Sequence, residues 1–228
     1  MINDLFVFDF DDTLATTVAK IGVARLHKKE NDELFRGWLT SHDLFPVDEK
    51  TQNGITYFYL PSEDFAKYQK FATDDISENT EDLFDFGDTS GVGGSTKENT
   101  QIISILKQAE SLQNSRVIIV TARAEGKMET PFGEIESTNR KDIENFLSGA
   151  GSSINQSQIF PVGSNDPNSK VRIVKKYIEM LHPKTVHFYD DNELNVDAVH
   201  QLCDELRGTP NIIVHKVSDG IPGAGIEC

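Results

Sequence analysis

Several polar residues follow directly after an apolar run near the start of the chain. The run at residues 5–8 reads Leu-Phe-Val-Phe, and it is followed by Asp9, Asp11, Asp12 and Thr13. An unbroken apolar run is typical of a strand buried on both faces, as in a parallel sheet. Carboxylates beside such a strand are costly unless a metal ion or another partner compensates their charge. Because ligands bind beyond the carboxyl ends of strands in open α/β sheets, we expect chemistry here.

A second apolar run, residues 117–120, also ends in polar residues. Thr121 follows it directly, and Arg123 lies two positions later. Thr121 taken alone is typical of a hydroxyl at a strand end, but its place after a second core strand favours a functional role. The Arg123 guanidinium is shaped to contact a phosphate with two hydrogen bonds, and a surface ion pair is an equally good interpretation.

A third apolar run, residues 186–189, ends in the adjacent carboxylates Asp190 and Asp191, with Asn195 a few positions later. Acidic residues are favoured at helix N-termini, so a plain helix start is the alternative interpretation. Two adjacent carboxylates directly after an apolar strand favour a functional site instead.

Lys170 lies near the start of a predicted helix. A lysine in the first turn opposes the helix dipole, and residues that break a local rule often lie at functional sites. Its neighbours Arg172, Lys175 and Lys176 are alternatives that helical periodicity does not eliminate.

Alternating strand and helix patterns predict the fold. Helices are expected after Asn99, Thr138 and Ser169 and across residues 194–206, where Gly208 would follow the last turn. Such alternation predicts a Rossmann-like, doubly wound parallel α/β sheet with helices on both faces. The predicted strands are residues 5–8, 117–120, 159–162, 186–189 and 212–214.

Residues 16–98 form an insert within this core of residues 1–15 and 99–228. Within the insert, the Asn53-Gly54 pair predicts a turn before a strand at residues 55–60, and Ser62 is a predicted helix start. Residues 73–88 are acid-rich and predicted as loop. Residues 30–98 hold 16 acidic and 5 basic residues, a net charge of −11. Such a field repels long polyanions.

The composition narrows the class of protein. A chain of 228 residues with 37% hydrophobic residues can build one α/β core with an insert. No apolar stretch is long enough to span a membrane, and no signal-like segment opens the sequence. The chain has 2 cysteines, and Cys203 is predicted as a small buried apolar side chain. We therefore expect a cytoplasmic protein without a disulfide scaffold.

In chain order, the polar residues resemble the four motifs of the haloacid dehalogenase (HAD) superfamily of phosphotransferases. The resemblance covers roughly residues 1–15 and 99–216. It leaves out the insert, which stands where HAD proteins carry a cap or flap that helps to set substrate choice. The matching positions are Asp9-x-Asp11-x-Thr13, Thr121, Lys170 and Asp190-Asp191.

The resemblance implies a role for each of these residues. Asp9 would attack phosphorus, and Asp11 would act as the acid and base. Phosphate binding would fall to Thr121, Arg123 and Lys170. Mg²⁺, which prefers oxygen ligands, would be held by Asp9, the backbone carbonyl of Asp11, and Asp191. Supporting contacts are implied for Thr13, Asp190 and Asn195.

These expectations describe a Mg²⁺-dependent phosphomonoester hydrolase that acts through an aspartyl-phosphate on a small phosphorylated metabolite or nucleotide. The presence of Asp11 favours a phosphatase or phosphomutase, because dehalogenases of this superfamily lack it. A polynucleotide-end phosphatase, a phosphomutase and a non-catalytic phosphate-binding protein are the alternatives. A receiver-like regulatory domain is disfavoured by the chain length and by the position of Asp9 on the first strand. The sequence indicates neither the precise substrate nor an oligomeric state.

Overall fold

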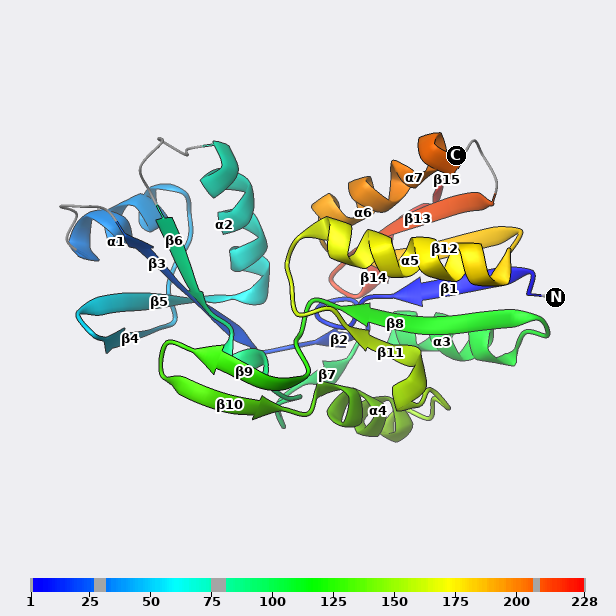
Figure 1. The fold of residues 1–228 in the computed structure, drawn as a ribbon, viewed down its shortest axis with the longest axis horizontal. Helices are drawn as coiled ribbons and strands as arrows, with labels where there is room; N and C mark the ends of the chain where they lie inside the picture. The colour runs from blue at the N-terminus through cyan, green and yellow to red at the C-terminus, as the bar shows by residue number, and fades with distance from the viewer. Residues whose placement is uncertain (1, 27–31, 75–80, 207–209, 228) are drawn as a thin grey trace.

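The computed structural model describes residues 2–26, 32–74, 81–206 and 210–227. Its centre is a mostly parallel sheet (Figure 1). All five predicted strands are confirmed, and two short strands, β14 (Ile221–Pro222) and β15 (Ile226–Glu227), pair antiparallel with the last of them. The parallel strands lie in the order β11 (Ile159–Pro161), β8 (Ser115–Thr121), β1 (Asp4–Phe8), β12 (Thr185–Asp190) and β13 (Asn211–Ser218).

Helices cover both faces of this sheet, as the alternation of side chains along a buried strand requires. Phe6 and Phe8 of β1 pack with α3 (Thr100–Ser111) and α4 (Asn139–Gly149). Leu5 and Val7 pack on the opposite face with α5 (Pro167–Leu181), α6 (Glu193–His200) and α7 (Leu202–Leu206). The molecule is thus a mixed α/β protein compatible with a Rossmann-like fold.

The helix starts test the capping predictions. Asn99 and Thr138 directly precede α3 and α4, as predicted, but neither side chain makes a capping hydrogen bond. The prediction for Ser169 is wrong, because α5 begins earlier: the Asp166 side chain accepts the Asn168 N–H, and Pro167 occupies the first turn. An aspartate followed by proline is a stronger helix start than a serine inside the turn.

The last predicted helix, residues 194–206, also differs, because the structure divides it into α6 and α7 around Gln201. Gly208 lies outside the described residues. A short 3₁₀ turn, η2 (Gln156–Gln158), precedes β11.

The insert folds into a second, antiparallel sheet with two helices, α1 (Asp32–Ser41) and α2 (Ser62–Asp74). The predicted turn is confirmed, since Asn53 and Gly54 have φ of 53° and 78° between β4 and β5. The predicted strand and the helix start at Ser62 are confirmed as well. The strands lie in the order β4 (Asp48–Gln52), β5 (Ile55–Pro61), β3 (Lys20–Leu26) and β6 (Glu81–Asp85).

The loop prediction for residues 73–88 is wrong at β6, which pairs with β3 in spite of its acidic composition. Two acids of β6 are bound by side chains from other elements. Asp82 accepts hydrogen bonds from Arg25 and Tyr68, and Asp85 accepts one from Tyr59. A 3₁₀ turn, η1 (Gly87–Thr89), follows the strand.

Two connections join the insert to the core at a single neck. β2 (Ala15–Thr16) leaves the core, β7 (Lys97–Glu98) returns to it, and the two pair antiparallel. Asn99, next to β7, donates hydrogen bonds to the backbone oxygens of Thr13 and Asp12. The neck is therefore bonded directly to the loop that follows β1.

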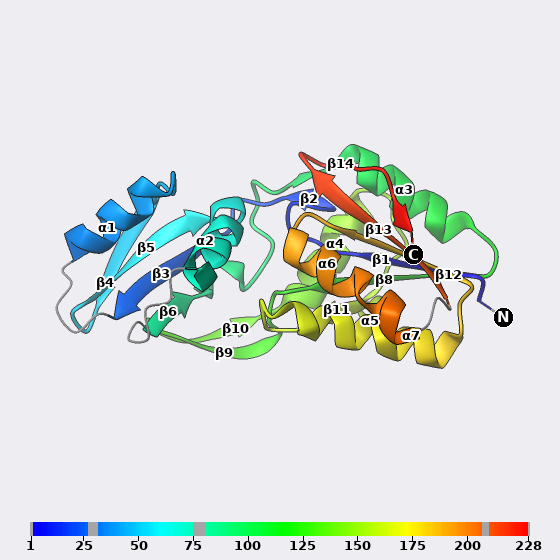
Figure 2. The same cartoon turned by 90° about the horizontal axis from the view of Figure 1, so that it is seen from above.

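A hairpin absent from the sequence-based prediction extends from the core towards the insert (Figures 1 and 2). It consists of β9 (Gly126–Thr130) and β10 (Gly133–Ser137) and follows β8. At its tip the Phe132 ring lies 5.8 Å from the Tyr57 ring of the insert. The space beyond the carboxyl end of β8 is therefore bordered by the hairpin as well as by the insert.

The structure also tests two further sequence-based predictions, one on Cys203 and one on membrane-spanning segments. Cys203 lies in α7 and is buried, as predicted, but it forms a disulfide, so its interpretation as only a small apolar side chain is wrong. Among the described residues, no helix is long and apolar enough to cross a membrane.

Candidate functional site

A pocket lies where the carboxyl ends of the core strands face the insert. It contains about 950 Å³ of space free of atoms, part of which is open to solvent. The core, the insert and the hairpin all contribute to its wall. Of the residues predicted from the sequence, the pocket is lined by Asp9, Asp11, Arg123, Lys170, Asp190, Asp191 and Asn195.

Lys170 connects the two strand ends at the floor of the pocket. Its Nζ donates to an Asp9 oxygen at 2.7 Å and to an Asp190 oxygen at 2.8 Å. All three side chains are buried. The start of α5 thus places its lysine between β1 and β12, which explains the cation in the first turn.

Asp190 is fully occupied by these and other contacts. Besides Lys170, its oxygens accept hydrogen bonds from the Asn192 N–H and the Asn195 amide. It is also completely buried. Asp190 is therefore best described as the residue that holds Lys170 and Asn195 in place, in line with the supporting role that the resemblance implies.

Asp191 completes a group of carboxylates able to hold a cation. One oxygen each from Asp9, Asp190 and Asp191 lie within 4.8 Å of one another. Thr13 donates a hydrogen bond to Asp191 at 3.2 Å. Since Asp190 already has its partners, Asp9 and Asp191 are the better placed ligands. Oxygen ligands of this kind fit a hard divalent ion such as Mg²⁺.

The charge balance at the floor also fits a cation. Burial raises the pKa of Asp9 to about 8, and Asp190 and Asp11 add to the effect against the opposing Lys170. The pKa of Asp191 is raised by burial and by Asp190 and Asp9. Burial disfavours the charge of Lys170, but Asp190 and Asp9 outweigh it and raise the lysine pKa. One lysine therefore does not compensate these carboxylates, and a bound cation would favour their charged forms.

Asp11 is held by Arg123. The Arg123 Nε and Nη2 donate to the Asp11 carboxylate at 2.9 and 2.7 Å, and the Asp11 side chain is 23% exposed. Burial would raise the pKa of Asp11, but the charge and hydrogen bonds of Arg123, with smaller contributions from Thr17 and Lys170, together lower that pKa. The pair orients the proposed acid and base towards the pocket.

The remaining donors of Arg123 are bound to the return segment of the insert and to α4. Nη1 donates to the backbone oxygens of Thr89 and Gly91 and to the Asn139 side chain. The Arg123 side chain is only 2% exposed. In the described structure Arg123 thus makes a buried ion pair, which was not among the interpretations drawn from the sequence, and direct phosphate binding stays a prediction.

Thr121 ends β8 and is completely buried. Its hydroxyl oxygen accepts the Arg123 N–H at 3.3 Å, and the side chain does not line the pocket as described. Its role as a phosphate ligand also stays a prediction, as does the role of the Asp11 backbone carbonyl.

No role was predicted for Asp12 from the sequence. Asp12 adopts a positive φ of 55°, which is uncommon for a residue other than glycine. Its carboxylate accepts the Thr17 N–H and, at 2.5 Å, the hydroxyl of Ser62 at the start of α2. Asp12 therefore ties the loop after β1 to the insert. The only signal in the sequence was a third carboxylate in the run.

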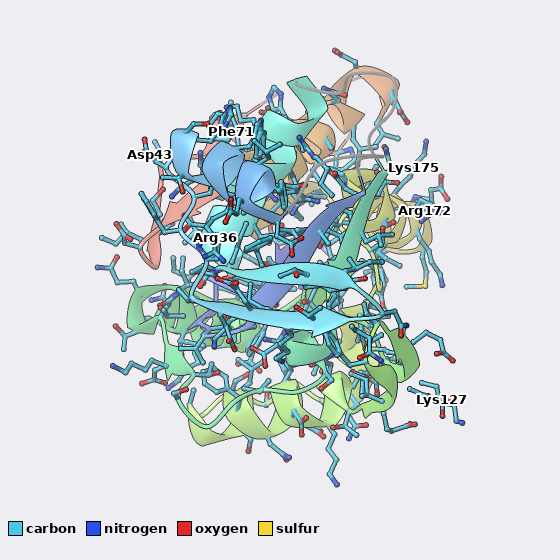
Figure 3. The ribbon with its side chains drawn as sticks, turned by 90° about the vertical axis from the view of Figure 1, so that its left-hand side faces the viewer. Arg36, Asp43, Phe71, Lys127, Arg172 and Lys175 are labelled. Atoms are coloured by element: carbon cyan, nitrogen blue, oxygen red, sulfur yellow. The ribbon has the colours of Figure 1, made fainter. Side chains whose placement is uncertain are left out.

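The alternatives to Lys170 lie outside the pocket. Arg172 donates to Ser169, and Lys175 forms an ion pair with Glu205 at 2.7 Å. Figure 3 shows Arg172 and Lys175 projecting outward from the same side of the molecule. Lys176 is exposed as well. Of the four cations, Lys170 is thus the one that reaches Asp9.

Comparison of the chain with protein-family models, with curated proteins and with solved structures found no match.

Proposed function

We propose that this protein is a Mg²⁺-dependent phosphomonoester hydrolase that acts through an aspartyl-phosphate, with a core of the HAD type and the insert as its cap. The observation that carries the proposal is the position of Asp9. Its carboxylate lies at the floor of the pocket, one oxygen bound to buried Lys170, with Asp11 and Asp191 beside it. A nucleophile, an acid and base, and a cation site thereby converge in one pocket.

In the proposed reaction, an Asp9 oxygen attacks the phosphorus atom of the substrate, and the bond from phosphorus to the leaving oxygen breaks. Lys170 lies within reach of Asp9 and would contact an equatorial phosphoryl oxygen. Mg²⁺ held by Asp9 and Asp191 would supply charge neutralisation for two anions that otherwise repel each other. Water then hydrolyses the aspartyl-phosphate, which restores Asp9 and releases inorganic phosphate.

Asp11 would move the protons. It donates one to the leaving oxygen in the first step and removes one from water in the second. Arg123 lowers the pKa of Asp11 and so favours the carboxylate that the second step needs. The negative charge of a bound phosphate raises that pKa and favours the protonated acid of the first step.

Turnover of p-nitrophenyl phosphate tests the proposal. We expect activity that needs Mg²⁺ and disappears with EDTA. Asp9→Asn is nearly isosteric but removes the nucleophile, so kcat should fall at least 100-fold, or about 2.7 kcal/mol in barrier. Asp43→Asn is the matched control, since Asp43 is an exposed aspartate on the outer side of the insert (Figure 3).

Two outcomes would refute the proposal. Full activity in EDTA would rule out the cation site, and an Asp9→Asn protein with more than about a hundredth of the wild-type kcat would rule out the covalent step. Binding of phosphate without any turnover would favour the alternative of a non-catalytic phosphate-binding protein.

A further inference from the structure

Part of the pocket wall is apolar and is built from separate parts of the chain. The insert contributes Ala19, Ile21, Phe65 and Phe86, and the hairpin contributes Met128. The Phe65 and Phe86 rings meet edge to face, with centroids 5.8 Å apart and planes at 90°. Aromatic contacts of this kind fix both rings in place. The wall is therefore a formed surface that an apolar group can contact.

The two cations that line the pocket already have partners. Lys170 is bound to Asp9 and Asp190, and Arg123 is bound to Asp11. Among the described residues that line the pocket, five aspartates stand against these two cations, an excess of three acidic groups when all are ionised. A bound divalent ion reduces the excess to one. A phosphoryl group at Asp9 would contact Lys170 and the ion directly, whereas a second anionic group of the same substrate would meet only the excess of aspartates.

The lining also contains polar side chains without charge. Ser164 and Asn165 come from the segment after β11, and Gln69 comes from α2. Such groups form hydrogen bonds with hydroxyl or amide groups of a neutral ligand and give no compensation for a carboxylate or a second phosphate.

We infer that the substrate is a phosphomonoester with a single phosphate whose alcohol is uncharged and presents a flat apolar face, such as an arylmethyl alcohol or a nucleoside. The inference rests on the proposed function and adds the class of leaving group. The phosphate lies at Asp9, the apolar face lies against Phe65, Phe86 and Met128, and hydroxyl or amide groups face Gln69 and Asn165. Met128 would make the hairpin a determinant of substrate choice alongside the insert.

Pairs of matched esters test the two parts of the inference separately: the apolar face of the alcohol and its lack of charge. Benzyl phosphate and methyl phosphate differ in the apolar face, and benzyl phosphate and 4-carboxybenzyl phosphate differ in one negative charge. We expect kcat/KM for benzyl phosphate to exceed each of the others by at least about 10-fold, which corresponds to about 1.4 kcal/mol. Release of inorganic phosphate from each ester in the presence of Mg²⁺ is the measurement.

Variants of the pocket wall then test which residues cause the substrate preference. Phe65→Ala should lower the ratio of kcat/KM for benzyl phosphate to kcat/KM for methyl phosphate about 10-fold, whereas the exposed control Phe45→Ala should leave this ratio unchanged. Met128→Lys adds a cation to the wall and should improve 4-carboxybenzyl phosphate at least 5-fold relative to benzyl phosphate, an estimate from partly exposed charge pairs. Met128→Gln, of similar size but neutral, should not.

The outcomes are distinguishable. If no ester is hydrolysed, the proposed function falls, and the substrate class falls with it. If the esters are hydrolysed but 4-carboxybenzyl phosphate is the best of them, or methyl phosphate equals benzyl phosphate, the hydrolase stands and the inferred class is overturned. If Met128→Gln changes the preference as much as Met128→Lys does, the charge argument is overturned.

Discussion

The buried pair of Arg123 and Asp11 predicts a strong energetic coupling between the two residues. We consider Arg123→Met, which keeps the length of the side chain, and Asp11→Asn, which keeps its shape. Breaking a buried ion pair by removing one partner costs about 3–5 kcal/mol, because the other charge stays uncompensated. Arg123 also loses its bonds to Thr89, Gly91 and Asn139. We therefore expect Arg123→Met to lower the free energy of unfolding by about 4 kcal/mol.

Asp11→Asn should cost less, about 2 kcal/mol, because Arg123 keeps three oxygen acceptors and the Asp11 side chain is 23% exposed. The double variant should be more stable than the sum of the single effects implies. The coupling energy should be about 2 kcal/mol, since the pair is bidentate and charged.

Urea unfolding of the wild type, the two single variants and the double variant measures this coupling. A matched cycle on Lys127 and Glu134 is the control, because that pair has the same kind of short contact, 2.8 Å, but side chains that are 72% and 50% exposed. Its coupling should stay below about 1 kcal/mol. If the effects of Arg123→Met and Asp11→Asn add within about 0.5 kcal/mol, the reasoning is refuted, and Arg123 would act only through its carbonyl and amide acceptors.

Three other predictions follow from the site and the sheet. Lys170→Ala should lower kcat/KM by at least about 100-fold, whereas Lys175→Ala, which removes an exposed cation from the same helix, should change it less than about 2-fold; the reverse order would contradict the assignment of Lys170. Mg²⁺ at 100 times its Kd should stabilise the wild type by about 2.7 kcal/mol, and Asp191→Asn should remove most of that gain; an equal shift of Tm in both proteins would place the ion elsewhere. Burial and then His215 lower the pKa of His187 below 6.5, so the unfolded chain binds protons more readily, and stability should be lost as the pH falls below about 6.5. His187→Gln should flatten this pH dependence in urea unfolding, and an unchanged slope would exclude His187 as its cause.

The sequence predicts one part of the fold well, namely the buried strands that end in polar residues. The run before Asp9 and the run before Asp190 are apolar because both faces of their strands are covered, so local composition alone identifies them. The parallel arrangement then requires their ends to meet, which is why Asp9, Lys170 and Asp190 could be expected in one site.

The parts that sequence reasoning missed depend on contacts between distant residues. The strand at Asp82 and Asp85 looks like a loop until Arg25, Tyr68 and Tyr59 are placed against its carboxylates. The hairpin carries only one pocket residue, Met128, among polar neighbours, so its apolar signal is weak. For Arg123, both interpretations from the sequence assumed a free or exposed guanidinium, because the backbone acceptors that bury it belong to the returning end of the insert.

The single neck has a consequence for how this protein can change over time. The segments that enter and leave the insert pair with each other, Ala15 with Glu98 and Thr16 with Lys97. The two ends of the insert are therefore neighbours in space. A segment whose ends are close can be lengthened, shortened or exchanged for another without shifting the strands on either side. The core sheet could thus stay constant while successive inserts are grafted onto the same two residue pairs. The hairpin, anchored separately after β8, would constrain which grafts fit, because each new insert has to meet its Phe132 tip.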